Sequence, residues 1–322
     1  MYDIVALGEV LIDFTPAGQS DLGYTLFERN PGGAPANVLA ALAKWGKRTG
    51  FISKVGADNH GQFLVDTLEK CGIHTQGVVM SKEANTTLAF VQLDASGDRS
   101  FSFYRKPGAD TLLAVDEVRL DLIANSKLFH FGSLSMTDEP SASATKKALL
   151  FAKENGCKIS FDPNLRIPLW DDLEHAKRMM EFGLSYADIV KLSEEELVFL
   201  TGVTDLDEGS RMLSESFGLS VILITLAEKG AFYRFGQTTG SVRGYTVDAI
   251  DATGAGDAFF GGFLHGWLDG NYDIQTITEY DIQGLISFAN AAGALTTTRR
   301  GAIPAIPTLE EIRKVTKMHD NS

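Results

Sequence analysis

Apolar stretches of strand length alternate with amphipathic stretches of helix length over much of the chain. The strand-like runs lie near residues 127–132, 158–162, 188–192 and 221–225, and the helical patterns lie near 140–155, 172–186 and 193–201. Continuous apolar runs are typical of strands buried on both faces, and strands that alternate with helices form parallel βαβ units. The pattern therefore predicts an α/β fold with a central, mainly parallel sheet covered by helices on both faces.

The first apolar run, residues 4–13, ends at an acid, Asp13. We interpret it as one more buried strand of the central sheet. In open α/β sheets ligands gather beyond the carboxyl ends of the strands, and Asp13 at such an end can accept hydrogen bonds from hydroxyl groups. For an acid considered alone, a solvated loop position is the alternative, because acids are mostly exposed.

The segment from residue 75 to residue 105 has a different pattern. Two short runs, 89–93 and 100–104, flank a turn at 94–98 that contains Gly97, which predicts a β-hairpin. Because a hairpin does not belong in a doubly wound core, we expect a small β-sheet lid that excludes water from the site. The lid takes segments of approximately 12–32 and 75–110. No repeat or long linker interrupts the chain, so residues 1–322 are expected to form a single domain.

Composition narrows the classes of partner. The chain has 29 Lys and Arg against 42 Asp and Glu, a formal net charge of −13, and no basic cluster, which argues against nucleic acid as a partner. A nucleotide remains compatible, since backbone N–H groups and a few cations suffice locally. No apolar run approaches the ~20 residues of a membrane span and no signal-peptide pattern is present, so a cytoplasmic protein is expected. Cys71 and Cys157 have no metal-ligand spacing and are expected to be reduced thiols.

The most informative motif is Asp-Ala-Thr-Gly-Ala-Gly-Asp at residues 251–257, directly before an apolar stretch at 258–268. Gly254 and Gly256 allow a tight turn that brings N–H groups to a ligand, and the helix that follows adds unpaired donors and a positive dipole end. This is an anion site. Asp257 would lie in the first helical turn, where it can take a proton from a hydroxyl that attacks phosphorus. The alternative is an ordinary turn with Asp257 as a dipole partner, because short glycine motifs also match by chance.

A second glycine pair, Gly32 and Gly33, precedes a helix that is expected to start near Ala34 or Pro35 and to stop at Gly46. Together the two stretches resemble the N-terminal and C-terminal signatures of the PfkB, or ribokinase-like, carbohydrate kinases. The usual C-terminal pattern is Asp-Thr-Thr-Gly-Ala-Gly-Asp, and this chain departs from it at Ala252.

The resemblance implies a ribokinase-like, three-layer α/β/α core with a mainly parallel central sheet and a small β-sheet lid. It implies that Asp257 is the catalytic base and that main-chain N–H groups at Gly254, Ala255 and Gly256 stabilise the developing charge. In the family, the sugar pocket is lined by residues that correspond to Asp13, Gly32, Gly33 and Asn37. A homodimer that forms through the β lid is implied as well.

Three segments are most similar to fructokinases within the family. They are Asp-Pro-Asn-x-Arg at 162–166, Phe-Tyr-Arg at 103–105 and Ser-Glu-Glu-Glu at 193–196. The similarity implies that Arg105 and Arg166 contact the substrate, a role that suits planar, permanently charged groups. As alternatives, Asp162 and Asn164 cap the next turn, and Arg105 is an exposed hairpin charge.

The nucleotide side is expected around residues 188–196. Ser193 with Glu196 three residues later is a capping box, which needs no ligand. The family usually has Asn-x-x-Glu here, in the magnesium and phosphate region, so Glu196 either acts on Mg²⁺ through water or only caps the helix. Lys191 either faces the phosphates or is exposed.

Thr225 and Gly230 resemble a Thr-x-Gly-x-x-Gly element that contacts nucleotide phosphates, with Ala227 in place of the first glycine. Asn290, on a small-residue helix at 288–294, is the polar candidate for the adenine pocket, and close helix packing is the alternative. The resemblance also implies a potassium-type ion near Asp251, although relatives differ in needing one.

The sequence thus favours an ATP-dependent and Mg²⁺-dependent sugar kinase, with fructose as substrate and fructose 6-phosphate as product. The first alternative is a 2-keto-3-deoxygluconate kinase, whose acidic substrate would pair with Arg105 and Arg166. Aminoimidazole riboside and ribose are less favoured substrates. From other classes, a sugar or nucleotide sensor without turnover and a structural protein remain, although a sensor has no need of Asp257.

Overall fold

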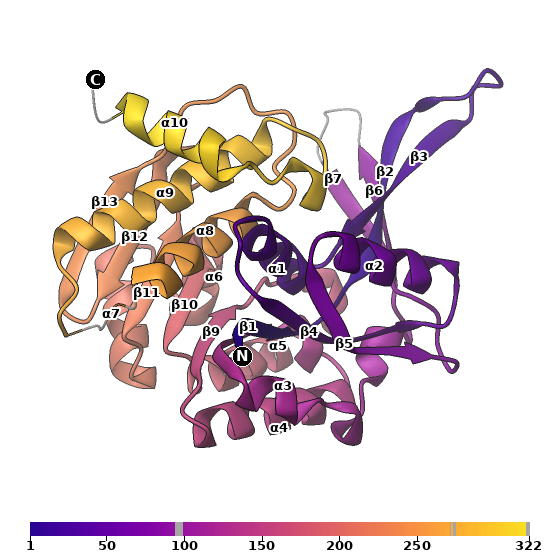
Figure 1. Cartoon of the computed structure of the whole chain (residues 1–322), viewed down its shortest axis with the longest axis horizontal. Helices are drawn as coiled ribbons and strands as arrows, with labels where there is room; N and C mark the ends of the chain where they lie inside the picture. The colour runs from indigo at the N-terminus through magenta and orange to yellow at the C-terminus, as the bar shows by residue number, and fades with distance from the viewer. Residues whose placement is uncertain (94–98, 271, 273–274, 320–322) are drawn as a thin grey trace.

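Two β-sheets organise the computed structural model (Figure 1), which describes residues 1–93, 99–270, 272 and 275–319. The large sheet contains β1 (Tyr2–Leu7), β4 (Thr49–Gly56), β5 (Ile73–Ser81), β8 (Ser126–Gly132), β9 (Lys158–Asp162), β10 (Ile189–Ser193), β11 (Val221–Thr225), β12 (Gly230–Phe235) and β13 (Thr238–Arg243). Its order is β13-β12-β11-β10-β9-β8-β1-β4-β5. All pairs from β11 to β5 are parallel, and β12 and β13 form an antiparallel edge.

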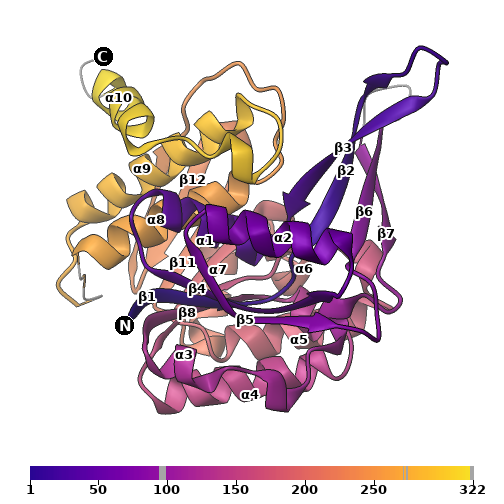
Figure 2. The ribbon, with the colours of Figure 1, turned by 45° about the vertical axis from the view of Figure 1, so that its right-hand side comes forward.

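Helices cover both faces of the large sheet (Figure 2). One face carries α1 (Ala34–Lys44), α2 (Asn59–Lys70), α8 (Ala255–Gly270), α9 (Glu279–Thr297) and α10 (Leu309–His319). The other carries α3 (Leu120–Ala124), α4 (Ser141–Glu154), α5 (Leu173–Leu184), α6 (Glu194–Thr201) and α7 (Leu206–Phe217). Within β1, Ile4 and Ala6 join the core on one face while Val5 and Leu7 join the core on the other, as the twofold side-chain period of a strand requires. The three-layer α/β/α prediction is confirmed.

The predicted elements of the central region agree with the observed ones to within two residues at each end. The strands predicted near 158–162 and 221–225 are β9 and β11, and the helix predicted near 140–155 is α4. None of the described helices is both long enough and apolar enough to span a bilayer.

The interpretation of residues 4–13 as one strand was wrong. β1 ends at Leu7, and after a break the chain enters β2 (Leu11–Gln19), which belongs to the second sheet. The break contains Gly8 and Glu9, yet every residue from 4 to 12 is buried, so burial does not mark the change from one sheet to the other. Asp13 therefore lies on the small sheet, not at the carboxyl end of a core strand.

The small sheet contains β2, β3 (Thr25–Gly32), β6 (Leu88–Leu93) and β7 (Arg99–Tyr104) in the order β3-β2-β6-β7. It projects from one side of the molecule (Figure 1). β6 and β7 pair antiparallel, as the hairpin prediction requires, and the predicted turn at 94–98 lies outside the described residues. Residues 75–81, assigned to the lid from sequence, lie instead in β5 of the large sheet. β5 is an edge strand whose burial alternates, so it resembles a lid strand in sequence.

Candidate active site

The segment before α8 forms the tight turn that its glycines predict. Gly254 has φ 76°, and a Cβ at this position would lie 2.6 Å from the Cβ of Ala302, so both the conformation and the contact require glycine. Asp257 lies in the first turn of α8 with 8% of its surface exposed. Its Oδ2 accepts a hydrogen bond of 2.8 Å from Nδ2 of Asn37, which is 220 positions away in the chain.

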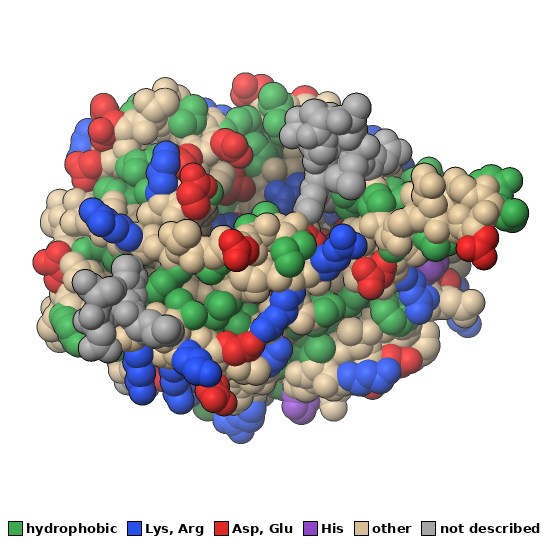
Figure 3. Space-filling model, turned by 90° about the horizontal axis from the view of Figure 1, so that it is seen from above, with side chains coloured by type: hydrophobic (Ala, Val, Ile, Leu, Met, Phe, Trp, Pro, Cys, Tyr) green, Lys and Arg blue, Asp and Glu red, His purple; other side chains and the backbone are tan. Residues whose placement is uncertain are grey.

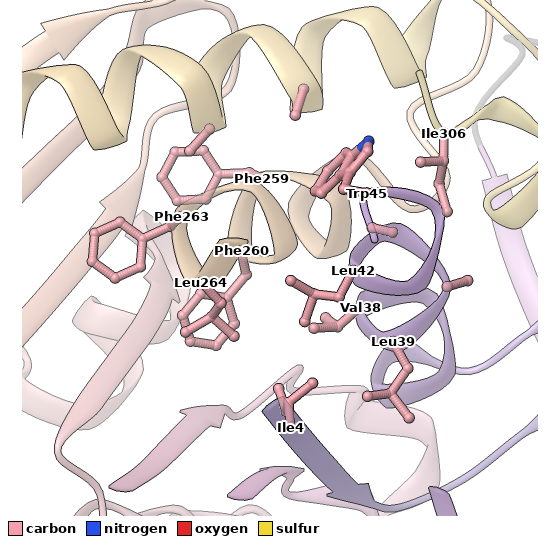
Figure 4. Packing of buried hydrophobic residues seen from close by; sticks show 14 of the residues in the cluster. Ile4, Val38, Leu39, Leu42, Trp45, Phe259, Phe260, Phe263, Leu264 and Ile306 are labelled. Atoms are coloured by element: carbon pink, nitrogen blue, oxygen red, sulfur yellow. The ribbon is translucent and has the colours of Figure 1, made fainter. Parts of the chain in front are cut away.

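Hydrophobic packing between α1 and α8 explains how these two residues meet (Figure 4). Val38 and Leu42 of α1 face Phe260 of α8 across the core. A Cβ at Gly261 would lie 3.0 Å from the Cβ of Ala41, which shows how closely the two helices approach. Asn37 lies in α1 directly before Val38, so the packing of α1 against α8 holds the amide of Asn37 beside Asp257.

A cavity of about 1040 Å³ opens beside Asp257. It combines residues of both sheets and of the helices that follow the core strands. The predicted site residues that line it are Asp13, Gly33, Asn37, Arg166, Lys191, Glu196, Thr225, Gly254, Gly256 and Asp257. A cleft of this size accommodates substrates as large as a nucleotide with a sugar.

One wall of the cavity carries Asp13 and Arg166. Burial, together with the nearby negative charges of Asp257 and Asp251, raises the pKa of Asp13 to about 7, while the charge of Arg166 opposes that rise. Gly32 does not line the cavity but leaves space for Asp13, since a Cβ there would lie 2.0 Å from Oδ2 of Asp13. Arg166 lines the cavity and is itself exposed.

Glu9 belongs to the same wall, and the sequence analysis did not identify it. It follows β1 directly after Gly8, lines the cavity and is 3% exposed. Its Oε1 accepts the N–H of Ala34 at 3.1 Å. A signal was present in the sequence, because Glu9 and Asp13 are two acids within an otherwise apolar run.

Another wall of the cavity carries Lys191, whose Nζ donates to both carboxylate oxygens of Asp162 at 3.0 and 2.9 Å. The exposed alternative for Lys191 was wrong, since both side chains of this pair are buried. Burial lowers the pKa of Lys191, but the carboxylates of Asp162, Glu196 and Asp257 outweigh it and raise the pKa above its usual value. Lys191 Nζ would lie 3.2 Å from a Cβ at Gly256, so a fixed positive charge stands beside the turn before Asp257.

Glu196 forms the predicted capping box at the start of α6. Its Oε2 accepts the N–H of Ser193, and Oγ of Ser193 accepts the N–H of Glu196. Its Oε1 accepts the N–H of Leu165, so both carboxylate oxygens already have protein donors. Within the part of the chain that the structure describes, no three acids, histidines or cysteines form a metal-binding cluster. This donor set is compatible with a Mg²⁺ ion held mainly by phosphates and water, which Glu196 would contact only through a water molecule.

Arg105 lies outside the large cavity, at 6% exposure. Its guanidinium donates to Asp110, to Thr137 and to the carbonyl oxygen of Leu134, so neither the exposed alternative nor direct contact with a substrate in the large cavity fits its position. The charge of Arg105 nevertheless acts on Glu9, whose pKa it lowers against the effect of burial.

Four other predicted residues do not line the cavity. Nδ2 of Asn290 donates to the carbonyl oxygens of Val242 and Arg243 and ties α9 to β13, which is a packing role. Gly230 has φ 107° at the start of β12, and a Cβ there would lie 2.1 Å from the carbonyl oxygen of Val242. The third and fourth residues serve the turn before α8: Ala255 donates its N–H to the carbonyl of Ala252, and Asp251 accepts N–H groups from Thr253 and Gly301.

Comparison with known proteins decides the family. Residues 1–309 match the model of the pfkB family carbohydrate kinases. The chain belongs to this family. It is 43% identical over 316 residues to probable fructokinase-4 of Arabidopsis thaliana, a match that covers 98% of this chain and 96% of the relative. It is 44% identical over 312 residues to fructokinase-2 of Solanum lycopersicum, with 96% and 94% covered.

Solved structures of this kinase family share the fold. A fructokinase from Xylella fastidiosa with bound ATP has a TM-score of 0.91 at 34% identity, over 99% of this chain and 100% of that one. A fructokinase double mutant from Vibrio cholerae O395, bound to fructose, ADP and a potassium ion, has a TM-score of 0.87 at 33% identity, with 98% of each chain covered. The ribokinase-like fold prediction is confirmed.

Proposed function

We propose that this carbohydrate kinase is an ATP-dependent fructokinase, which transfers the γ-phosphate to the C6 hydroxyl of D-fructose. One observation carries the proposal. The carboxylate of Asp257 lies at the first turn of α8 in a large cavity, held by the amide of Asn37, between a wall of sugar-binding acids and a wall with Lys191. The fructokinase relatives at 43–44% identity support fructose as the substrate.

The chain's own groups account for the proton transfer. Asn37 donates to Oδ2 of Asp257, which leaves Oδ1 to accept the proton of the sugar hydroxyl as its oxygen attacks phosphorus. The first turn of α8 directs main-chain N–H groups at the transferring phosphoryl group, and these donors are fixed before the reaction begins. Lys191 adds a positive charge beside Gly256, where negative charge accumulates.

Two cations belong to the proposal. Mg²⁺, when bound to ATP, would neutralise the phosphates, and Glu196 would hold it through water because its oxygens already accept two N–H groups. A potassium-type ion is proposed near Asp251, supported by the potassium-bound fructokinase from Vibrio cholerae O395. Activity in potassium salts should exceed activity in tetramethylammonium salts, and equal activity in both would remove this ion from the proposal.

The lid carries the proposed dimer interface. Leu22, Tyr24, Leu26 and Phe27 are 41–82% exposed, and Figure 3 shows hydrophobic side chains at the projecting end of the lid, among polar and acidic ones. Large exposed apolar side chains grouped on one projection fit a second copy of the chain. Light scattering should give twice the monomer mass, and a monomer mass at micromolar concentration would contradict the dimer. A cytoplasmic location is proposed with it, to be checked by cell fractionation.

ADP release by the purified protein tests the function. Fructose should be phosphorylated with the highest kcat/KM in a panel that also contains 2-keto-3-deoxygluconate, aminoimidazole riboside and ribose. Because Arg166 lines the cavity while Arg105 does not, an acidic sugar would lack one of its two expected partners. Sugar binding without ADP release would instead indicate a sensor.

A further inference from the structure

Two buried acceptor atoms beside the proposed sugar position have no hydrogen-bond donor among the described residues. They are Oε2 of Glu9 and Oδ1 of Asn37, and both residues line the large cavity. A buried acceptor without a donor loses its bonds to water and gains nothing in return. Such atoms in a binding cavity call for a ligand that brings O–H or N–H groups.

The two carboxylate oxygens of Glu9 differ in their hydrogen bonds. Oε1 accepts the N–H of Ala34, the first residue of α1, where the preceding Gly33 offers no side-chain cap. This bond is structural, because it supplies the acceptor that the start of α1 otherwise lacks. It accounts for one oxygen and leaves Oε2 unexplained.

The surroundings fix Glu9 in place. Gly33 has φ 111°, and a Cβ there would lie 2.5 Å from the carbonyl oxygen of Glu9, so the glycine loop packs directly on the backbone of Glu9. Behind Glu9, the charge of Arg105 favours the ionised carboxylate, while the opposite charge of Asp110, its buried ion-pair partner, disfavours it. Burial acts against that charge and raises the pKa of Glu9 to about 7, a cost that a hydroxyl donor on Oε2 would reduce.

We infer that Glu9 is a specificity-determining residue, whose Oε1 positions the glycine loop and whose Oε2 accepts a hydrogen bond from a sugar hydroxyl other than the one that is phosphorylated. The inference rests on the proposed function. It also gives Arg105 a role: Arg105 acts on the sugar through Glu9 rather than by direct contact.

Glu9→Gln tests the inference. The amide oxygen of the glutamine keeps an acceptor for Ala34, while its NH₂ group cannot accept a hydroxyl. KM for fructose should rise roughly 10-fold to 100-fold, as for loss of a hydrogen bond to a charged group, with KM for ATP unchanged. Glu154→Gln, on the exposed end of α4, is the matched control and should leave both constants unchanged.

Sugars that lack one hydroxyl distinguish a hydrogen bond between Glu9 and the sugar from a role of Glu9 in positioning the glycine loop. The panel is 1-deoxyfructose, 3-deoxyfructose, 4-deoxyfructose and 2,5-anhydro-D-mannitol, which lacks the hydroxyl at C2. For one of these sugars, KM with the unaltered protein should be as high as KM for fructose with Glu9→Gln. For that same sugar, Glu9→Gln should raise KM no further. Equal losses for every sugar would mean that Glu9 only positions the loop, and an unchanged KM for fructose would overturn the inference outright.

A second variant and a distinct outcome keep the inference testable. Glu9→Asp keeps the charge but is too short to hold Ala34 and a hydroxyl together, so the analogue comparison can be repeated if the Gln variant folds poorly. Failure of the proposed function has a distinct outcome, since then no sugar in the panel releases ADP with the unaltered protein.

Discussion

The two walls of the cavity satisfy their polar atoms in opposite ways. The wall of Lys191 and Glu196 is proposed to bind the nucleotide and is called the nucleotide wall here, and the wall of Glu9 and Asp13, with Asn37 beside it, is the proposed sugar wall. On the nucleotide wall, Lys191 donates twice to Asp162, and both carboxylate oxygens of Glu196 accept backbone N–H groups. On the sugar wall, Glu9 and Asn37 each keep a buried acceptor without a donor among residues that the structure describes. The charged groups of the nucleotide wall thus have partners within the protein, although Nδ2 of Asn164, which also lines the cavity, has none among the described residues, whereas the sugar wall has two buried acceptors without a donor.

The difference suggests how affinity and rate are divided between the walls. A buried acceptor without a donor costs about 1–3 kcal/mol, so a sugar that brings hydroxyls to the right positions gains more than one that lacks them. Fixed charges and main-chain donors, in contrast, stabilise phosphoryl groups of any substrate. We therefore expect changes on the sugar wall to alter KM for the sugar, and changes at the junction around Asp257 to alter kcat.

The largest effect is expected at that junction. Asp257→Asn keeps the size of the side chain but removes the proton acceptor, so kcat should fall about 10²-fold to 10⁴-fold. KM for fructose should stay within a few-fold of its original value, as steady-state ADP release will show. Asp116→Asn, an exposed change of the same type, should have no effect. Near-original turnover in Asp257→Asn would refute the base assignment.

A change on the nucleotide wall should reduce stability as well as activity. Lys191→Met leaves Asp162 as an unpaired buried carboxylate, which typically costs about 3–5 kcal/mol in the free energy of unfolding. Urea unfolding measures this loss. The surface pair of exposed Lys158 and half-buried Asp188 provides the control, since Lys158→Met should cost less than about 1 kcal/mol.

The double variant Lys191→Met, Asp162→Leu separates the two effects of this change. Removing the unpaired carboxylate should recover most of the stability, while KM for ATP should remain raised because the positive charge is still missing. Recovery of both properties would mean that Lys191 serves the fold alone.

Sequence reasoning succeeded where local pattern and structure coincide. Residues 158–162 alternate polar and apolar side chains and residues 221–224 are continuously apolar, and both segments form strands at the predicted positions. The positive φ of Gly254 is equally local, because the turn before α8 requires it. The contact of that turn with Ala302, in contrast, depends on a distant part of the chain.

The remaining site residues depend on contacts between distant parts of the chain. Asn290 reaches the carbonyls of β13, and Arg105 reaches Leu134 and Thr137, and neither residue lines the large cavity. The unpaired oxygen of Glu9 likewise becomes apparent only when α1 packs above β1. Hydrogen-bond competition of this kind cannot be predicted from the residue type alone.

The smallest predicted effect is the contribution of Asp13 to the free energy of unfolding when no sugar is bound. In the folded protein Asp13 keeps its proton up to about pH 7, whereas in the unfolded chain it loses the proton near 3.8. The folded state thus binds more protons in this range, so the free energy of unfolding should fall as the pH rises from about 4 to about 7. Cavity water reduces the effect of Asp13 to the order of 1 kcal/mol.

Asp13→Asn isolates this contribution, because Glu9 titrates in the same range in both proteins. Unfolding in urea at pH 5 and pH 8 should show a smaller fall in stability for the variant than for the unaltered protein. Fructose should show the opposite dependence: its KM should rise below pH 7, since protonation removes an acceptor for a sugar hydroxyl. If both proteins lose the same stability between pH 5 and pH 8, the carboxyl of Asp13 is hydrated like an ordinary surface acid, and the contrast between the two walls rests on Glu9 and Asn37.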